Sequence, residues 1–180
     1  AEQLKPGRFR LLLVGDGLEP VRTLGNLPLK PEADLDALDA LADDGSLAAL
    51  VIPGGDHYAA GHDRLIKAVG RLVDEEIPVA AICGATLLLA HGGFLDERRH
   101  TSNAAQYLEA SGYRGSAHYV EAPVVTNQGV TTASGIHAIP FTAEVMRITG
   151  LVPNAMADAW EQVFLSARED DYMALMEATA

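Results

Sequence analysis

The single cysteine of the chain, Cys83, lies where a short apolar strand is expected to turn directly into a helix. Residues 78–82 form a continuous apolar run, and residues 85–90 continue in a helical pattern without a proline. So sharp a turn has room only for small neighbours, and Ala81 and Gly84 meet that demand. A nucleophile on such a turn forms a nucleophile elbow, here with cysteine in place of serine, and we expect Cys83 to adopt a strained backbone conformation.

The segment around Cys83 leaves two interpretations open. A thiol at the start of a helix feels the positive end of the helix dipole, which favours the nucleophilic thiolate. A cysteine that follows a buried strand can equally serve as a small hydrophobic core residue. Features elsewhere in the chain favour the catalytic interpretation.

Strand and helix patterns alternate along the chain. Strands are expected at residues 9–14, 21–24, 47–52 and 78–82, with a hairpin of residues 124–126 and 130–132. Helices are expected at residues 34–43, 62–76, 85–90, 104–110, 139–148, 155–167 and 171–178. This order predicts an α/β fold with a mostly parallel sheet and helices on both of its faces. A length of 180 residues suits a single domain, which we expect to span residues 1–180.

Composition excludes several classes of function. The longest apolar runs are too short to span a membrane, and we expect no secretory signal. A formal net charge of -12 argues against nonspecific binding to nucleic acids or to anionic membranes. A lone cysteine cannot form an internal disulfide, which fits a cytoplasmic protein. No group of side chains has the spacing of metal ligands, and we expect neither a metal nor another cofactor.

A second strand end carries unusual residues. Pro53, Gly54 and Gly55 follow the apolar run that ends at residue 52. The carboxyl ends of parallel strands meet at one edge of a sheet, which is where ligands bind in such folds. The backbone amides of Gly55 or Asp56 and of Gly84 are therefore predicted to form an oxyanion hole beside the Cys83 sulfur. The Pro-Gly-Gly sequence alone would do no more than end a strand.

Several segments resemble one known family and occur in its order. They are residues 51–55, 80–85, 93–96, 100–103, 123–126 and 132–135. The chain resembles the ThiJ/PfpI superfamily, which has the class I glutamine amidotransferase-like fold and includes the parkinsonism-associated deglycase and the intracellular protease PfpI. The resemblance implies a flavodoxin-like three-layer sandwich, a reactive cysteine at position 83 and frequent homodimers. It also implies activities that range from amide hydrolysis through glyoxalase-type and isonitrile hydration to redox sensing.

The chain departs from the family pattern at its amino-terminal end. Many relatives carry a glutamate after the first strand that hydrogen-bonds the cysteine. Glu19 is one candidate for that acid, but residues 21–35 align better with a later hairpin and loop of the family. On that alignment the chain begins at the second strand of the family, and a strand–helix unit of about 30 residues is missing together with its glutamate.

The chain also departs from the family pattern at the positions of the histidine that would act as general base. PfpI-like proteases place a histidine immediately after the cysteine, where this chain has Gly84. Other relatives have a Thr-Thr-His segment, where residues 101–103 read Thr-Ser-Asn. Strand alternation directs the nearby His100 to the opposite face from Thr101. His137 is the best remaining histidine to pair with Cys83, although it can equally be a residue without chemistry at the start of a helix.

Two classes of function follow. In the first, the Cys83 thiolate attacks a small electrophilic substrate, as in a hydrolase or a hydratase/glyoxalase-type enzyme, and Gly55, Gly84 and His137 assist. In the second, the chain is a noncatalytic or redox-sensing stress protein that uses reversible oxidation of Cys83. An amidotransferase-like scaffold that serves a partner protein is a third possibility.

We expect a homodimer or larger homo-oligomer, because a missing strand would leave an open sheet edge.

Overall fold

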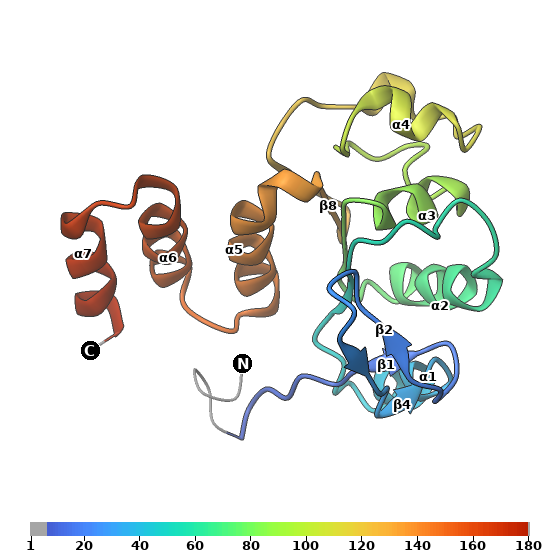
Figure 1. The fold of residues 1–180 in the computed structure, drawn as a ribbon, viewed down its shortest axis with the longest axis horizontal. Helices are drawn as coiled ribbons and strands as arrows, with labels where there is room; N and C mark the ends of the chain where they lie inside the picture. Colours follow the sequence, from blue (N-terminus) through green and yellow to red (C-terminus); the bar gives the residue numbers. More distant parts are fainter. Residues whose placement is uncertain (1–6, 180) are drawn as a thin grey trace.

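A four-stranded sheet carries helices on both of its faces in the computed structural model, which describes residues 7–179 (Figure 1). Its strands are β5 (Leu50–Ile52), β6 (Val79–Ile82), β7 (Val124–Asn127) and β8 (Val130–Ala133). The strand order is β5-β6-β8-β7, in which the first three strands are parallel and β7 runs antiparallel to β8. The predicted α/β fold with a mostly parallel sheet is therefore confirmed.

The central strand β6 separates two apolar layers. Val79 and Ala81 pack in one core with helices α2 (Asp63–Asp74) and α3 (Ala85–His91). Ala80 points to the opposite face, where it packs with Phe141 of helix α5 (Ala138–Thr149). Because successive side chains of a strand alternate between its faces, an entirely apolar strand is buried between two helical layers.

The remaining helices extend these layers. Helix α4 (Ala105–Glu109) packs on α3, and α6 (Asn154–Ser166) and α7 (Glu169–Thr179) follow α5. Figure 1 shows α5, α6 and α7 side by side, leading away from the sheet. Two short 3-10 helices, η1 (Ser116–His118) and η2 (Gly135–His137), lie in the connections before β7 and after β8. Among residues 7–179, no helix is long and apolar enough to cross a membrane.

The amino-terminal part of the chain lies beside the sheet without joining it. Strands β1 (Val14–Gly15) and β4 (Ala33–Asp34) form a parallel pair, and β2 (Val21–Arg22) and β3 (Pro28–Leu29) form a hairpin. Helix α1 (Ala37–Asp43) connects this part to β5 and packs on α2.

Two arginines of α2 tie the amino-terminal part to the main layer. Arg64 forms ion pairs with Asp16, Asp34 and Asp36, which come from the segments around β1, β4 and α1. Two helical turns further on, Arg71 binds the carboxylates of Asp39 and Asp43 on α1, together with Glu75 at the end of α2. These contacts hold α1 against α2 by charge as well as by apolar packing.

The prediction of a strand at residues 9–14 is wrong except at Val14, which lies in β1. The Leu13 amide donates to the Glu32 carboxylate and its carbonyl accepts from the Glu32 and Ala33 amides, so no regular ladder extends towards residue 9. The strand at residues 21–24 ends at Arg22, because the Thr23 carbonyl and hydroxyl accept bonds that close a turn.

The strand predicted at residues 47–52 is also shorter, and begins at Leu50. The Ser46 and Leu47 amides both donate to the Leu41 carbonyl, which ties the preceding residues to the end of α1.

His100 is fully buried, and its ring contacts a tyrosine on each of two neighbouring segments. The Nδ1 atom donates to the Arg98 carbonyl at 2.7 Å, and Nε2 accepts from the Tyr113 hydroxyl at 3.2 Å. The Tyr119 ring meets the imidazole edge to face. This placement agrees with the expectation that His100 faces away from the site residues that follow it.

Burial lowers the pKa of His100, and the nearby His118 adds to this effect, against the opposing influence of the Arg98 carbonyl and Asp96. A histidine with a lowered pKa in the folded state binds fewer protons there than in the unfolded chain. Stability is then fully present above about pH 6.5 and is lost as the pH falls, by at most about 1.4 kcal/mol for each pH unit. We expect the free energy of unfolding, measured with urea, to fall less between pH 7.5 and pH 5 in His100→Gln than in the exposed control His91→Gln. An equal fall in the two variants would contradict the assignment of this pH dependence to His100.

Candidate active site

Cys83 lies on the turn between β6 and α3 in a left-handed backbone conformation, with φ of 59°. Residues with a side chain rarely adopt this region, and its occurrence often marks a functional turn. The Cys83 amide donates to the Ala133 carbonyl of β8 at 3.0 Å, which fixes the turn at the carboxyl end of the parallel strands. The strained strand-to-helix elbow predicted for Cys83 is therefore confirmed.

Glycines from two other segments close around the cysteine. A β-carbon at Gly135 would lie 2.8 Å from the Cys83 sulfur, and one at Gly54 would lie 2.9 Å from the Cys83 β-carbon. Such separations are far below normal van der Waals contact, so a side chain at either position would crowd the thiol. The backbone that follows β5 and β8 therefore packs directly against the Cys83 side chain.

The two glycines predicted to supply oxyanion amides lie against each other. A β-carbon at Gly84 would meet the Gly55 carbonyl oxygen at only 1.9 Å, so the two backbones touch directly beside Cys83. Within residues 7–179, the structure shows no protein acceptor for the amide of either glycine. Backbone amides that lack a protein partner are available to a ligand oxygen. Their role in stabilising an oxyanion stays a prediction.

Asn103 is the polar side chain that contacts the Cys83 sulfur. Its Nδ2 atom donates to Sγ over 3.6 Å, and its Oδ1 atom accepts from the Gly135 amide at 2.9 Å. The second bond determines the orientation of the side-chain amide, because only the oxygen can accept from an N–H group. The NH2 group is thereby directed at the sulfur, where it stabilises negative charge.

His137 forms a different contact from the one predicted. Its Nδ1 atom lies 2.7 Å from the Ser134 hydroxyl, and its amide donates to the Ser134 carbonyl. In the described part of the chain, the polar side chain paired with Sγ is that of Asn103 rather than His137. The assignment of His137 as a general base stays a prediction that the observed contacts do not support.

Tyr107 lies within electrostatic range of both Cys83 and Asp56. Burial raises the pKa of Tyr107 on α4, and the charges of Cys83 and of Asp56 raise it further. Asp56 follows Gly55 in the loop after β5, so the loop and α4 both bring polar groups to the site. Tyr107 therefore stays a protonated hydrogen-bond donor at neutral pH.

A cavity of about 420 Å³ opens beside Asn103. Its walls come from residues 101–106, from Tyr119 and residues 121–123, and from the segment that contains Ser134 and His137. Ligand pockets for small molecules begin at about 300 Å³, so this volume accommodates a small substrate.

The structure brings Cys83, Gly84 and Gly55 together as the sequence predicted, but sequence reasoning missed the contacts made by Asn103 and Gly135. Asn103 occupies the position at which some relatives carry the histidine of a Thr-Thr-His segment, and that correspondence could have indicated it. Glu19, the alternative candidate for the family glutamate, is exposed between β1 and β2 and forms no hydrogen bond with the described residues.

Comparison with known proteins agrees with this geometry. The sequence profile of the DJ-1/PfpI family matches residues 1–148. The chain is 32% identical over 185 residues to a Bacillus subtilis protein named as the uncharacterized protease YoaZ, covering 97% of this chain and 86% of that protein. The chain belongs to the DJ-1/PfpI family.

Solved structures give the same result. A ThiJ/PfpI family protein from Bacillus anthracis superposes with a TM-score of 0.81 at 30% identity, over 92% of this chain and 77% of that one. A DJ-1 superfamily protein from Agrobacterium tumefaciens gives a TM-score of 0.77 at 34% identity, over 87% of this chain and 82% of that one. The observed architecture is accordingly that of the DJ-1/ThiJ fold, a flavodoxin-like sandwich.

Proposed function

We propose that this chain is a cysteine-dependent enzyme of the reducing cytoplasm, which acts on small carbonyl compounds through the Cys83 thiol. The supporting observation is the set of donors around one strained cysteine. Asn103 Nδ2 is directed at the sulfur, and the Gly55 and Gly84 amides are available beside it. Similarity to a relative named as a protease is consistent with hydrolytic chemistry.

The proposed reaction begins with addition of the thiol across the carbonyl group. The sulfur forms a bond to the carbonyl carbon, the π electron pair moves to oxygen, and the thiol proton ends on that oxygen. The Gly55 and Gly84 amides stabilise the developing charge. With an amide substrate, the adduct breaks its C–N bond as the hydroxyl proton passes to the amine. Water then hydrolyses the thioester to the acid and the free thiol.

A screen of small aldehydes and amides with the wild type and Cys83→Ser tests this proposal. Turnover of at least one substrate should fall by a factor of about 100 or more in the variant, because a hydroxyl is a much weaker nucleophile than a thiolate. Turnover that is equal in both proteins would contradict the proposal.

The same donors favour a second candidate function, which is redox sensing. A sulfenate or sulfinate on Cys83 would present oxygen to the Asn103 amide and to the unpaired glycine amides. Peroxide should then add one or two oxygen atoms to Cys83, detected by intact-mass measurement, in a protein that turns over none of the screened substrates. Turnover without such oxidation would favour the enzyme.

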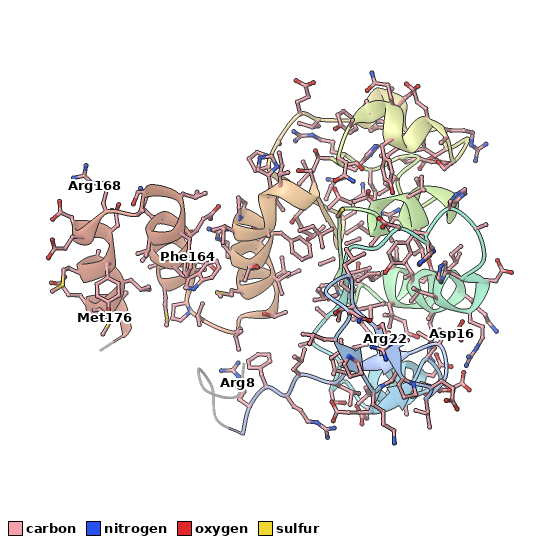
Figure 2. The ribbon with its side chains drawn as sticks, viewed as in Figure 1. Arg8, Asp16, Arg22, Phe164, Arg168 and Met176 are labelled. Carbon is pink, nitrogen blue, oxygen red and sulfur yellow. The ribbon has the colours of Figure 1, made fainter. Side chains whose placement is uncertain are left out.

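We also propose that two copies of the chain associate through the β2–β3 hairpin. Four large aliphatic residues there are exposed: Val21, Leu24, Leu27 and Leu29. Residues 17–31 carry two cations, one of them Arg22, against one carboxylate, although the whole chain has a net charge of -12 (Figure 2). Two such patches can therefore meet without the repulsion that the rest of the surface would cause.

Light scattering at micromolar concentration should give the mass of a dimer for the wild type and of a monomer for Leu24→Glu. The change places a charge on the apolar patch, where its burial is costly. The control Leu165→Glu alters another exposed leucine, on α6, and should leave the dimer intact. A wild-type monomer, or a dimer that survives Leu24→Glu, would contradict the hairpin interface.

A further inference from the structure

The cavity beside Asn103 has an asymmetric distribution of charge. Glu121 is the only carboxylate among the described residues that line it, and none of these residues is a lysine or an arginine. Glu121 is exposed and forms no ion pair or hydrogen bond with residues 7–179. An unpaired carboxylate on the wall of a cavity attracts a cationic group and repels an anionic one.

Asn103 and His137 are two further polar groups of the cavity lining. Asn103 lines the cavity and also contacts the Cys83 sulfur, so this one side chain joins the cavity to the reacting atom, which is not itself part of the described lining. Nδ1 of His137 is hydrogen-bonded to the Ser134 hydroxyl, which leaves Nε2 as the ring nitrogen available to a ligand. Ala104, Ala122 and Ile136 contribute small or apolar side chains to the same lining.

We propose that this cavity, the Glu121 pocket, holds the non-reacting end of the substrate and selects carbonyl compounds that carry an ammonium group there. The assignment rests on the proposed function of Cys83. The carbonyl group lies at the sulfur, within reach of the Gly55 and Gly84 amides, and the cationic end lies towards Glu121. Compounds that end in a carboxylate are disfavoured, because no cation in the described lining compensates their charge.

Charged thiol reagents of similar size test the pocket separately from the chemistry. The measurement is the rate of Cys83 modification by 2-aminoethyl methanethiosulfonate, a cation, divided by the rate with the anionic 2-sulfonatoethyl analogue, at low ionic strength. Glu121→Gln should lower this ratio about threefold, and Glu121→Lys should lower it further, because a unit charge is removed or reversed a short distance from the reagent. Glu177→Gln on the distant α7 removes the same charge and should leave the ratio unchanged.

The outcomes distinguish the two proposals. A ratio that is equal in wild type and Glu121→Gln, or that falls equally in Glu177→Gln, overturns the pocket and assigns any preference to the overall charge. The rate with the neutral methyl methanethiosulfonate reports on the thiol alone. A slow neutral reaction with a ratio that still depends on Glu121 would preserve the pocket and contradict the activated cysteine.

Discussion

Gly84→Ala is expected to destabilise the protein by about 3 kcal/mol and to abolish the reactivity of Cys83. The added methyl carbon would lie 1.9 Å from the Gly55 carbonyl oxygen. Both partners are backbone, so no flexible side chain can move to relieve the contact. The loop after β5 must shift away from the elbow, and the two amides beside the sulfur separate.

Gly70→Ala provides the matched control. Gly70 lies inside α2, and a β-carbon there would contact the Phe94 ring at an ordinary 3.7 Å. Alanine stabilises a helix by about 0.5–1 kcal/mol relative to glycine, so this variant should be slightly more stable than the wild type. Urea unfolding measures both changes. A loss below 1 kcal/mol in Gly84→Ala would show that the Gly55 contact is not as rigid as the structure indicates.

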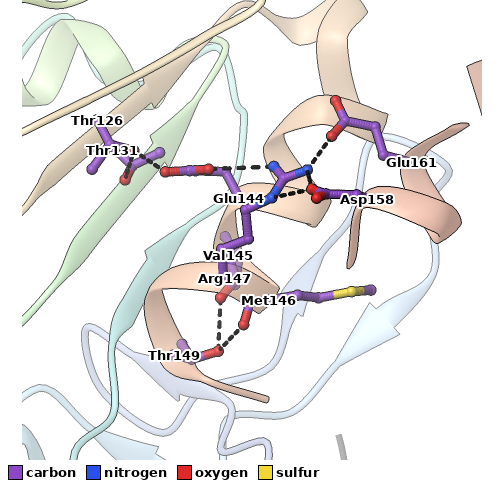
Figure 3. A network of polar contacts seen from close by, with 9 residues as sticks. All are labelled: Thr126, Thr131, Glu144, Val145, Met146, Arg147, Thr149, Asp158 and Glu161. Carbon is purple, nitrogen blue, oxygen red and sulfur yellow. Dashed lines mark hydrogen bonds and ion pairs between the residues drawn. The ribbon is translucent and has the colours of Figure 1, made fainter. Parts of the chain in front are cut away.

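Arg147→Met is expected to lower the free energy of unfolding by about 2–3 kcal/mol. Arg147 of α5 binds the carboxylates of Glu144, Asp158 and Glu161, and so joins α5 to α6 (Figure 3). The arginine is only 23% exposed, and Glu144 and Glu161 are 20% exposed. Removal of the cation leaves the carboxylates of Glu144 and Glu161 close together with little solvent to screen their repulsion, whereas Asp158 is 64% exposed.

The network also reaches the sheet, because Glu144 accepts a bond from Thr126 of β7 (Figure 3). Arg168→Met is the control, since the Arg168–Asp170 pair is 68% and 86% exposed and lies on the outermost part of the chain (Figure 2). Pairs that are so exposed contribute little, so its effect should stay within about 0.5 kcal/mol. Equal effects of the two variants in urea unfolding would mean that the Arg147 network does not anchor α6.

The parts of the fold that could be predicted from sequence are those with strong apolar periodicity. Strand β6 is apolar throughout and is buried on both faces, and α2 has a regular apolar face, so both elements appeared close to their predicted bounds. The elbow at Cys83 followed from the small residues between the apolar strand β6 and the helical pattern of α3.

The amino-terminal strands could not be placed in the same way. The apolar run at residues 9–14 has strand composition, but a strand forms only where a neighbour completes its ladder, and β1 pairs with β4 over two residues. In the site, Asn103 and Gly135 are brought to Cys83 by tertiary contacts across 20 and more residues, as the Asn103 bonds show. Local patterns carry no information about such contacts, whereas the motif order of the family indicated the region.

The rate of Cys83 labelling by iodoacetamide at pH 7, followed by intact mass, tests the central claim most directly. The chain has one cysteine, so the label reports on that site alone. We predict faster labelling than that of glutathione, and a roughly tenfold loss in Asn103→Ala, because a hydrogen bond to a charged group contributes about 1.5–3 kcal/mol. The exposed amide variant Gln162→Ala should label like the wild type. Labelling no faster than that of glutathione, and unchanged by Asn103→Ala, would contradict an activated cysteine.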